Sequence, residues 1–246
     1  GDDLARHPIN EWRDKYISDN EDMPQWYPNL FSGMPSYGGY IYMTGDPTKK
    51  FRNVILFNIG LKIWFFLSLG GFGSFFLLKV LGYSSVARVL GGLISGLTPY
   101  SFGLANAGHL NKIFAMGYAP WVFACFLLFM KNKSLKSLCV LSLVTALQLW
   151  ANHPQIVYYT WMIIGFYYVW KIIIEFKNQS LSSKTIAHQT GGIFVSILVA
   201  FLIVSDPYKE VYTFQQHSNR GAKSVLDKTN ETSSGTDWQY LSLIHI

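Results

Sequence analysis

Residues 108–130 read GHLNKIFAMGYAPWVFACFLLFM, a short polar island followed by eighteen residues that carry no charge. An apolar run of this length is a candidate transmembrane helix, because roughly 20 helical residues cross the hydrocarbon core of a bilayer. Similar apolar runs precede and follow it along the chain. The stretch therefore predicts an all-α membrane protein in which polar islands mark the turns between spans.

The composition of the 246-residue chain agrees with this class. Half of the residues are apolar and 14% are charged, whereas soluble proteins average roughly 25% charged residues. The net charge of +6 does not indicate nucleic acid, because the basic residues lie beside apolar runs and form no separate patch. Cys125 and Cys139 both fall in apolar runs and are expected to be small packed residues, neither a disulfide nor a metal pair.

The apolar runs predict a polytopic bundle of about six transmembrane helices. They are expected at about 55–80, 86–107, 113–130, 135–151, 156–174 and 191–205, the last being short unless it begins near Ile186. This divides the chain into an acidic, Trp/Pro-rich extracytoplasmic loop (1–53), a transmembrane bundle (54–205) and a second extracytoplasmic segment (206–246).

The charges of the connecting loops predict the orientation. With six spans, the loops at 79–88, 131–136 and 171–189 share one side, and they carry eight Lys or Arg residues against the single acid Glu175. Short loops rich in Lys and Arg remain in the cytoplasm. Both polar islands, at 108–112 and 152–155, are therefore expected on the opposite, extracytoplasmic side.

The first island contains two ionisable side chains. His109 and Lys112 are three residues apart, so one helical turn places both on the same face. Such a pair suits a phosphate group, with Lys as a point charge and His as a donor or proton carrier. The alternative is a His at a helix end beside a Lys that extends to the membrane interface.

The second island, Asn152-His153-Pro154-Gln155, joins two spans almost without a loop. Pro154 is a plausible first residue of the following helix, and the amides of Asn152 and Gln155 are candidates for capping or for ligand binding. A purely structural tight turn is the alternative for this island alone. Two His-bearing turns on one side of the membrane favour a functional site.

The N-terminal segment adds carboxylates and aromatic rings to that side. Residues 23–35, which include Trp26, are too rich in aromatic residues and Pro for a flexible linker, so they predict an ordered loop against the outer mouth of the bundle. The charges alone would equally suit a solvated surface. His109, His153 and an Asp are chemically suitable ligands for a divalent metal, but their spacing matches no recognised zinc motif, and the site is expected to hold none.

Three groups of residues carry a resemblance to a known family. They are Pro24-x-Trp26…Phe31-x-Gly33-Met34-Pro35, Gly108-His109-x-x-Lys112…Pro120-Trp121, and Leu147-Gln148…His153-Pro154-Gln155…Tyr158-Tyr159. From Gly1 to about Gln239 the chain resembles the bacterial YfhO-type membrane proteins, which are similar to polyprenyl-phosphate-dependent glycosyltransferases of the multi-spanning GT-C class. The resemblance implies a GT-C-like bundle in the bacterial inner membrane, with its site facing outward.

The resemblance also implies roles for particular residues. Asp3, or its neighbour Asp2, matches the catalytic acid of the first outer loop and would accept the proton of the acceptor hydroxyl. The expected donor is a polyprenyl-phosphate sugar, and the acceptor a cell-envelope polymer, lipid or protein. The remaining implied binding residues are His109 and Lys112 for the phosphate, Asn152, His153 and Gln155 for sugar or phosphate oxygens, and Trp26. The second and third spans would guide the polyprenyl chain.

Two other functions stay open at this point. A transporter or flippase for a lipid-linked or anionic substrate would place charged or broken-helix positions near the bilayer midplane. A non-catalytic membrane scaffold for envelope assembly would tolerate alanine at His109, His153 and the N-terminal acids.

The chain is expected to be an internal segment of a longer membrane protein, with a further helix before Asp2. It begins Gly-Asp-Asp, and its apolar tail, residues 241–246, resembles translated sequencing-adapter text. His245, within that tail, is therefore assigned no role.

Overall fold

The computed structural model describes residues 2–21, 24–28, 33–35, 46–178 and 182–215. The chain divides into two compact units, one with residues 46–204 and 1–8, the other with residues 9–45 and 205–246. Each unit is described by itself. The apolar tail at 241–246 lies outside the described residues.

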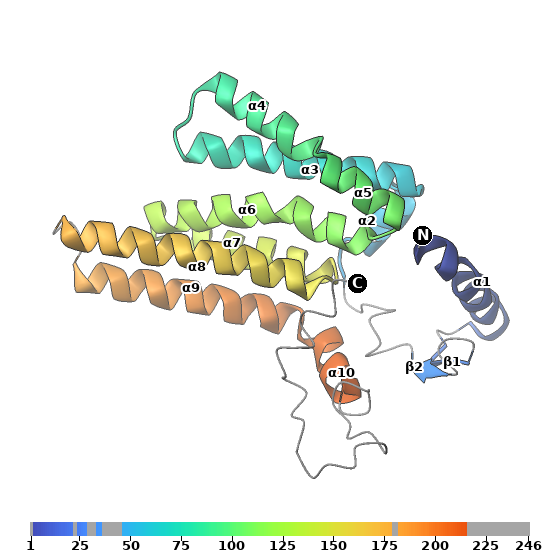
Figure 1. Cartoon of the computed structure of the whole chain (residues 1–246). Coiled ribbons are helices and arrows are strands. Elements are labelled where there is room, and N and C mark those ends of the chain that lie inside the picture. Colours follow the sequence, from blue (N-terminus) through green and yellow to red (C-terminus); the bar gives the residue numbers. More distant parts are fainter. Residues whose placement is uncertain (1, 22–23, 29–32, 36–45, 179–181, 216–246) are drawn as a thin grey trace, which may run out of the picture. The chain divides into compact units, whose positions relative to one another are not determined.

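The first unit is a bundle of antiparallel helices. They are α2 (Lys49–Val54), α3 (Ile59–Val80), α4 (Ser85–Gly96), α5 (Pro99–Ala107), α6 (Leu110–Asn132), α7 (Leu135–Trp150), α8 (Pro154–Lys177) and α9 (Ser183–Ile203) (Figure 1). In the described part of the chain, α3, α6, α8 and α9 are long and apolar enough to cross a membrane. Helix α7 is also apolar but has only 16 residues. The prediction of a mainly helical chain with apolar helices of membrane-spanning length is confirmed at this level, whereas the number of six spans stays a prediction.

The second predicted span, 86–107, is interrupted. Helix α4 ends at Gly96, and Thr98 adopts an extended conformation (φ −61°, ψ 131°) before α5 starts at Pro99. Proline has no backbone N–H to donate, and it disfavours helical geometry in the residue before it. The single helix expected here is therefore two short helices of 12 and 9 residues.

Two other boundaries differ from the predicted ones. Helix α3 begins at Ile59, because the Asn58 side chain accepts a hydrogen bond from the Gly60 backbone N–H (2.6 Å) and caps the helix. Helix α9 begins at Ser183, where Ser182 is the N-cap, and therefore reaches 21 residues. The sixth predicted span is thus long enough to cross a bilayer, as its alternative start near Ile186 implied.

Glycines bring α3 into direct contact with α6. A Cβ atom added to Gly117 would lie 2.8 Å from the backbone oxygen of Phe66, and one added to Gly70 would lie 3.5 Å from the Cα of Gly117. A Cβ at Gly73 would meet the indole of Trp121 at 2.6 Å, and that indole N–H donates to the Leu69 carbonyl (2.8 Å). In a bilayer, small residues stabilise helix pairs because they let backbones approach closely.

Buried polar side chains connect the other helices. Gln148 of α7 is fully buried and donates hydrogen bonds to the Ala115 carbonyl of α6 (3.1 Å) and to Thr160 Oγ1 of α8 (2.9 Å). Ser142 of α7 donates to Ser196 Oγ of α9 (3.2 Å). Gln148, which belongs to the family-like motif, therefore joins three helices inside the bundle.

The second unit contains a helix that the sequence did not predict. Residues Asp2–Asn20 form helix α1 in a segment that was expected to be a loop. The first residues of this helix, up to Pro8, group with the bundle unit, and the rest belong to the second unit. The ring of Trp12 packs on Tyr16 one turn later (centroids 5.5 Å apart) and on Tyr27 of β1 (5.3 Å). Strands β1 (Trp26–Tyr27) and β2 (Met34–Pro35) form a short antiparallel pair, and α10 (Ser205–Gln215) follows the bundle in sequence.

Candidate functional site

The two polar islands lie at the same end of the bundle. The first forms the turn between α5 and α6, and the second forms the turn between α7 and α8 (Figure 1). The C-terminal ends of α3, α6 and α8, which adjoin the basic loops of the sequence, lie at the opposite end of the bundle. The grouping of both islands on one side, predicted from the sequence, therefore agrees with the direction of the helices.

A glycine makes the first turn possible. Gly108 has φ 84°, a left-handed conformation that glycine adopts without steric cost. Its N–H donates to the Ala105 carbonyl (3.1 Å), and the N–H of His109 donates to the Leu104 carbonyl (2.9 Å), which completes the end of α5. His109 then becomes the exposed N-cap residue of α6.

Lys112 lies in the first turn of α6 and is half-buried. Its ammonium group is 5.5 Å from the ring centroid of Tyr100, an exposed residue of α5. A cation at this distance from an aromatic face is attracted by the ring quadrupole. The ring therefore helps to position the ammonium group at the end of the bundle.

The second turn depends on a left-handed asparagine and a proline. Asn152 has φ 57°, which Asn tolerates better than most residues. His153 is the N-cap residue of α8, and Pro154 is its first residue, which confirms the predicted helix start. Gln155 donates from Nε2 to the hydroxyl of Tyr159 one turn later (2.7 Å).

The charged groups of the first turn affect the imidazole of His153 in the second turn. Burial lowers its pKa below the ordinary value of 6.5, and the positive charges of Lys112 and His109 lower it further. The structure thus places Lys112 and His109 within electrostatic range of His153, and their joint role in a site stays a prediction. At neutral pH, the imidazole of His153 is therefore uncharged, near the ammonium group of Lys112.

The lowered pKa of His153 predicts a pH dependence of stability. Above about pH 6.5, His153 is neutral in both the folded and the unfolded protein, so its protonation does not reduce the stability of the fold. Stability is lost as the pH falls through the folded pKa, since the unfolded state binds the proton more readily. We expect the thermal midpoint of the purified protein to fall between pH 7.5 and 5, and His153→Asn to remove part of this fall.

The matched control for this titration is His188→Gln. His188 lies in α9, a helix that begins at the opposite end of the bundle, and its ring stacks on Phe129 of α6. This variant should keep the fall seen in the parent protein. A His153→Asn protein with the full parental pH dependence would contradict the assignment.

Other predicted site residues are placed less directly. Asp2 and Asp3 are the first residues of α1 and group with the bundle unit. Trp26 belongs to the second unit, where it is 54% exposed and its ring covers Gly33, whose added Cβ would lie 2.5 Å from it. The catalytic role of the two acids and the substrate contact of Trp26 stay predictions.

The bundle unit contains an ion pair that the sequence pattern did not indicate. The side chain of Asp46 is 1% exposed, pairs with Arg52, and accepts hydrogen bonds from the backbone N–H (2.8 Å) and hydroxyl (2.7 Å) of Thr48. The guanidinium of Arg52 lies 5.9 Å from the ring centroid of Phe114 in α6. The Asp-Pro-Thr sequence is a recognisable turn signal, but its ion partner and its burial depend on tertiary contacts.

The segment before the second island contains another missed residue. Trp150 is 8% exposed, and its indole N–H has no acceptor among the described residues. Buried indole N–H groups usually have a hydrogen-bond partner. In a sequence, a Trp at the end of an apolar run is equally typical of the membrane interface, so the pattern does not single it out.

No protein-family model matches this chain, and neither does a curated protein or a solved structure. The interpretation of the site therefore depends on its own geometry. Within the described ranges, no three His, Cys, Asp or Glu residues come together in a way that would hold a metal ion.

Proposed function

We propose that the protein is a membrane glycosyltransferase that moves a sugar from a polyprenyl-phosphate carrier to an acceptor outside the cytoplasm. The observation that carries this proposal is the convergence of His109, Lys112 and His153 at one end of an apolar helical bundle. Ammonium and imidazole groups are suitable partners for a phosphate. The surrounding helices suit a substrate whose other part is hydrocarbon.

The proposed reaction is an inverting displacement. A hydroxyl oxygen of the acceptor bonds to the anomeric carbon of the sugar, while the bond from that carbon to the phosphate oxygen breaks and its electron pair leaves with the phosphate. Asp3, with Asp2 as the neighbouring alternative, accepts the hydroxyl proton. Lys112 and His109 stabilise the negative charge that grows on the phosphate. His153, Asn152 and Gln155 orient oxygens of the sugar or phosphate.

The charge distribution supports an extracytoplasmic site. The ends of α3, α6 and α8 opposite the islands carry exposed lysines in or beside their last turns, namely Lys79, Lys131, Lys133, Lys136 and Lys177. Short basic loops remain in the cytoplasm. In the proposed arrangement, the protein spans the bacterial inner membrane several times and its site faces outward.

The test is a transfer assay on the complete protein in lipid nanodiscs with a radiolabelled polyprenyl-phosphate sugar. Asp3→Asn and His109→Ala are each expected to lower the initial rate by about 10²-fold or more, the usual loss when a positioned acid–base or charge-stabilising group is removed. Asp14→Asn is the control, because the side chain of this acid of α1 is 65% exposed and pairs with its sequence neighbour Arg13. Parental rates of sugar transfer by both Asp3→Asn and His109→Ala would contradict the proposal.

One observation favours a second candidate, a transporter or flippase for a lipid-linked or anionic substrate. The second predicted span is broken between α4 and α5, and broken helices often form the substrate sites of transporters. Proteoliposomes distinguish the two functions. A transporter would move the lipid-linked sugar across the bilayer without releasing the sugar from its phosphate.

A further inference from the structure

One buried side chain, Gln148 of α7, connects the two helices that begin at the polar islands. It is fully buried, and its amide Nε2 donates hydrogen bonds to the Ala115 carbonyl of α6 (3.1 Å) and to Thr160 Oγ1 of α8 (2.9 Å). The Thr160 hydroxyl donates its own proton to the Ile156 carbonyl (2.8 Å), so toward Gln148 it acts as the acceptor. Both amide protons of Gln148 are therefore used between helices.

The bonded carbonyl lies on the face of α6 that carries Lys112. Ala115 is three residues after Lys112, and residues three apart lie on the same face of a helix. The two residues are separated by about 4.5 Å along the helix axis. A rotation of α6 that broke the bond to Ala115 would therefore also turn the Lys112 side chain in another direction.

Gln148 is equally near the second island. It lies in the last turn of α7, five residues before His153, and its acceptor Thr160 lies in the second turn of α8. The charges of Lys112 and His109 affect the imidazole of His153. A change in the distance between the islands would thus be measurable at this imidazole.

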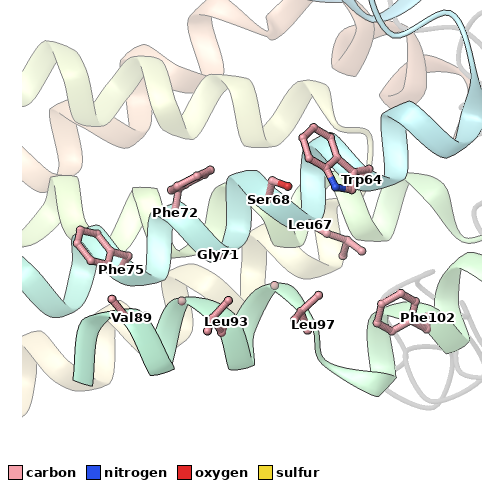
Figure 2. Close-up of a pocket in the computed structure, with 12 residues that line it drawn as sticks. Trp64, Leu67, Ser68, Gly71, Phe72, Phe75, Val89, Leu93, Leu97 and Phe102 are labelled. Carbon is pink, nitrogen blue, oxygen red and sulfur yellow. The ribbon is translucent and has the colours of Figure 1, made fainter. Parts of the chain in front are cut away.

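The apolar contacts of the bundle are less directional than these hydrogen bonds. Figure 2 shows the example of α3 and α4, where Phe72, Phe75 and Leu93 line an apolar groove. Apolar contacts of this kind have no preferred direction, and in a bilayer the lipid tails are as apolar as the side chains. A hydrogen bond requires a defined distance and angle. We therefore expect polar links to set the rotation of the helices near the islands.

We propose that Gln148 is a positioning residue, whose two hydrogen bonds set the rotation of α6 against α7 and α8 and thereby the distance between Lys112 and His153. Its role in sugar transfer rests on the proposed function, whereas its effect on the two islands does not. A single buried polar residue has a comparable role in coiled coils, where one Asn specifies the register of the helices at a cost in stability.

The test measures the electrostatic coupling between the islands in the complete protein in lipid nanodiscs. The measured quantity is the rise in the pKa of His153 that Lys112→Met causes, followed by NMR titration of labelled histidines. It is compared between the parent protein and Gln148→Met, which keeps an unbranched side chain of similar length and removes both hydrogen bonds. We expect the rise to fall to about half or less in Gln148→Met, because the Coulomb energy decreases with distance and with a higher effective dielectric constant.

Gln189→Met is the matched control for this substitution. Gln189 of α9 is also buried, and its Nε2 donates to the Met130 carbonyl of α6 (3.2 Å), near the end of α6 opposite the islands. Both substitutions remove a buried glutamine that is bonded to α6, so both should lower the thermal midpoint. Only Gln148→Met should reduce the coupling. An equal reduction in both variants, or an unchanged coupling in Gln148→Met, would overturn the inference.

Substitutions at Thr160 test the same junction when Gln148→Met does not fold. Thr160→Ser keeps the hydroxyl that accepts from Gln148 and should keep the parental coupling. Thr160→Val has the shape of threonine without the acceptor and should reduce the coupling. Equal coupling in the Ser and Val proteins would contradict the role of this hydrogen bond.

Measurements of sugar transfer separate this inference from the proposed function. Where both hold, Gln148→Met should lower kcat about tenfold, because small displacements of positioned groups slow a reaction strongly, and Gln189→Met should retain the parental kcat. A coupling that depends on Gln148 supports the inference even if no sugar is transferred. Transfer that requires His109 but proceeds at the parental rate in Gln148→Met, with unchanged coupling, would refute the positioning role and leave the enzyme assignment in place.

Discussion

Replacing Lys112 by Met is expected to lower sugar transfer by about two to three orders of magnitude, the typical loss when one group that stabilises transition-state charge is removed. The Met side chain is similar in length and remains able to pack against Tyr100, so the variant removes the charge and little of the packing. The effect should appear mainly in kcat, because the negative charge on the leaving phosphate is largest in the transition state. Initial rates over a range of carrier concentrations measure it.

The same helix offers a matched control for this variant. Lys131 lies near the other end of α6 and is exposed, so Lys131→Met removes the same charge from the opposite side of the bundle. Transfer by Lys131→Met should equal that of the parent protein. A similar loss in both variants would indicate a general effect of net charge and contradict a local role for Lys112.

Lys112→Met also has a readout that does not depend on activity. The positive charge of Lys112 is one cause of the lowered pKa of His153. Its removal should therefore raise that pKa toward the ordinary value, as measured by NMR titration of selectively labelled histidines. An unchanged His153 titration would show that the two turns are farther apart than the structure places them.

Much of the fold was predictable because apolar length and turn chemistry act locally. The apolar runs after Lys112 and after Pro154 form α6 and α8. In a bilayer the backbone N–H and C=O groups must bond to one another, and within a single apolar segment only a helix pairs them all. The number of spans between the two islands then required both to lie at the same end. The charge of the loops predicts which end faces the cytoplasm, and this orientation stays a prediction.

The missed features depend on contacts between distant residues. The ion pair of Asp46 and Arg52 needs both the turn at Thr48 and the ring of Phe114 from another helix. Helix α1 is polar along most of its length, so apolar periodicity did not reveal it, and its aromatic contact with Tyr27 forms only once β1 is in place. Gln148 looks like a site residue in a motif, and only the packing of three helices shows that its amide is used inside the bundle.

The contact between α3 and α6 leads to the largest expected effect on stability. Gly117→Ala places a Cβ atom 2.8 Å from the backbone oxygen of Phe66, closer than such atoms pack in real proteins. A backbone oxygen cannot move aside as the end of a flexible side chain can, so α3 must move away from α6 to make room for the added Cβ atom. We expect a loss of about 2–3 kcal/mol, the upper range for overpacking. The thermal midpoint should fall by about 6 °C, as measured by the loss of monodisperse protein on size exclusion after heating.

Gly165→Ala separates this packing effect from the intrinsic preference of helices for alanine. Gly165 lies inside α8, and an added Cβ there would meet nothing within 4 Å. Alanine is favoured over glycine by about 1 kcal/mol in a helix interior, so Gly165→Ala should leave the midpoint unchanged or raise it. The two substitutions add the same atom to the same kind of helix, and only the neighbouring backbone differs. A midpoint for Gly117→Ala equal to that of Gly165→Ala would mean that α3 and α6 are not in backbone contact. The position of the first island would then lose its support, because α6 begins beside His109 and carries Lys112 in its first turn.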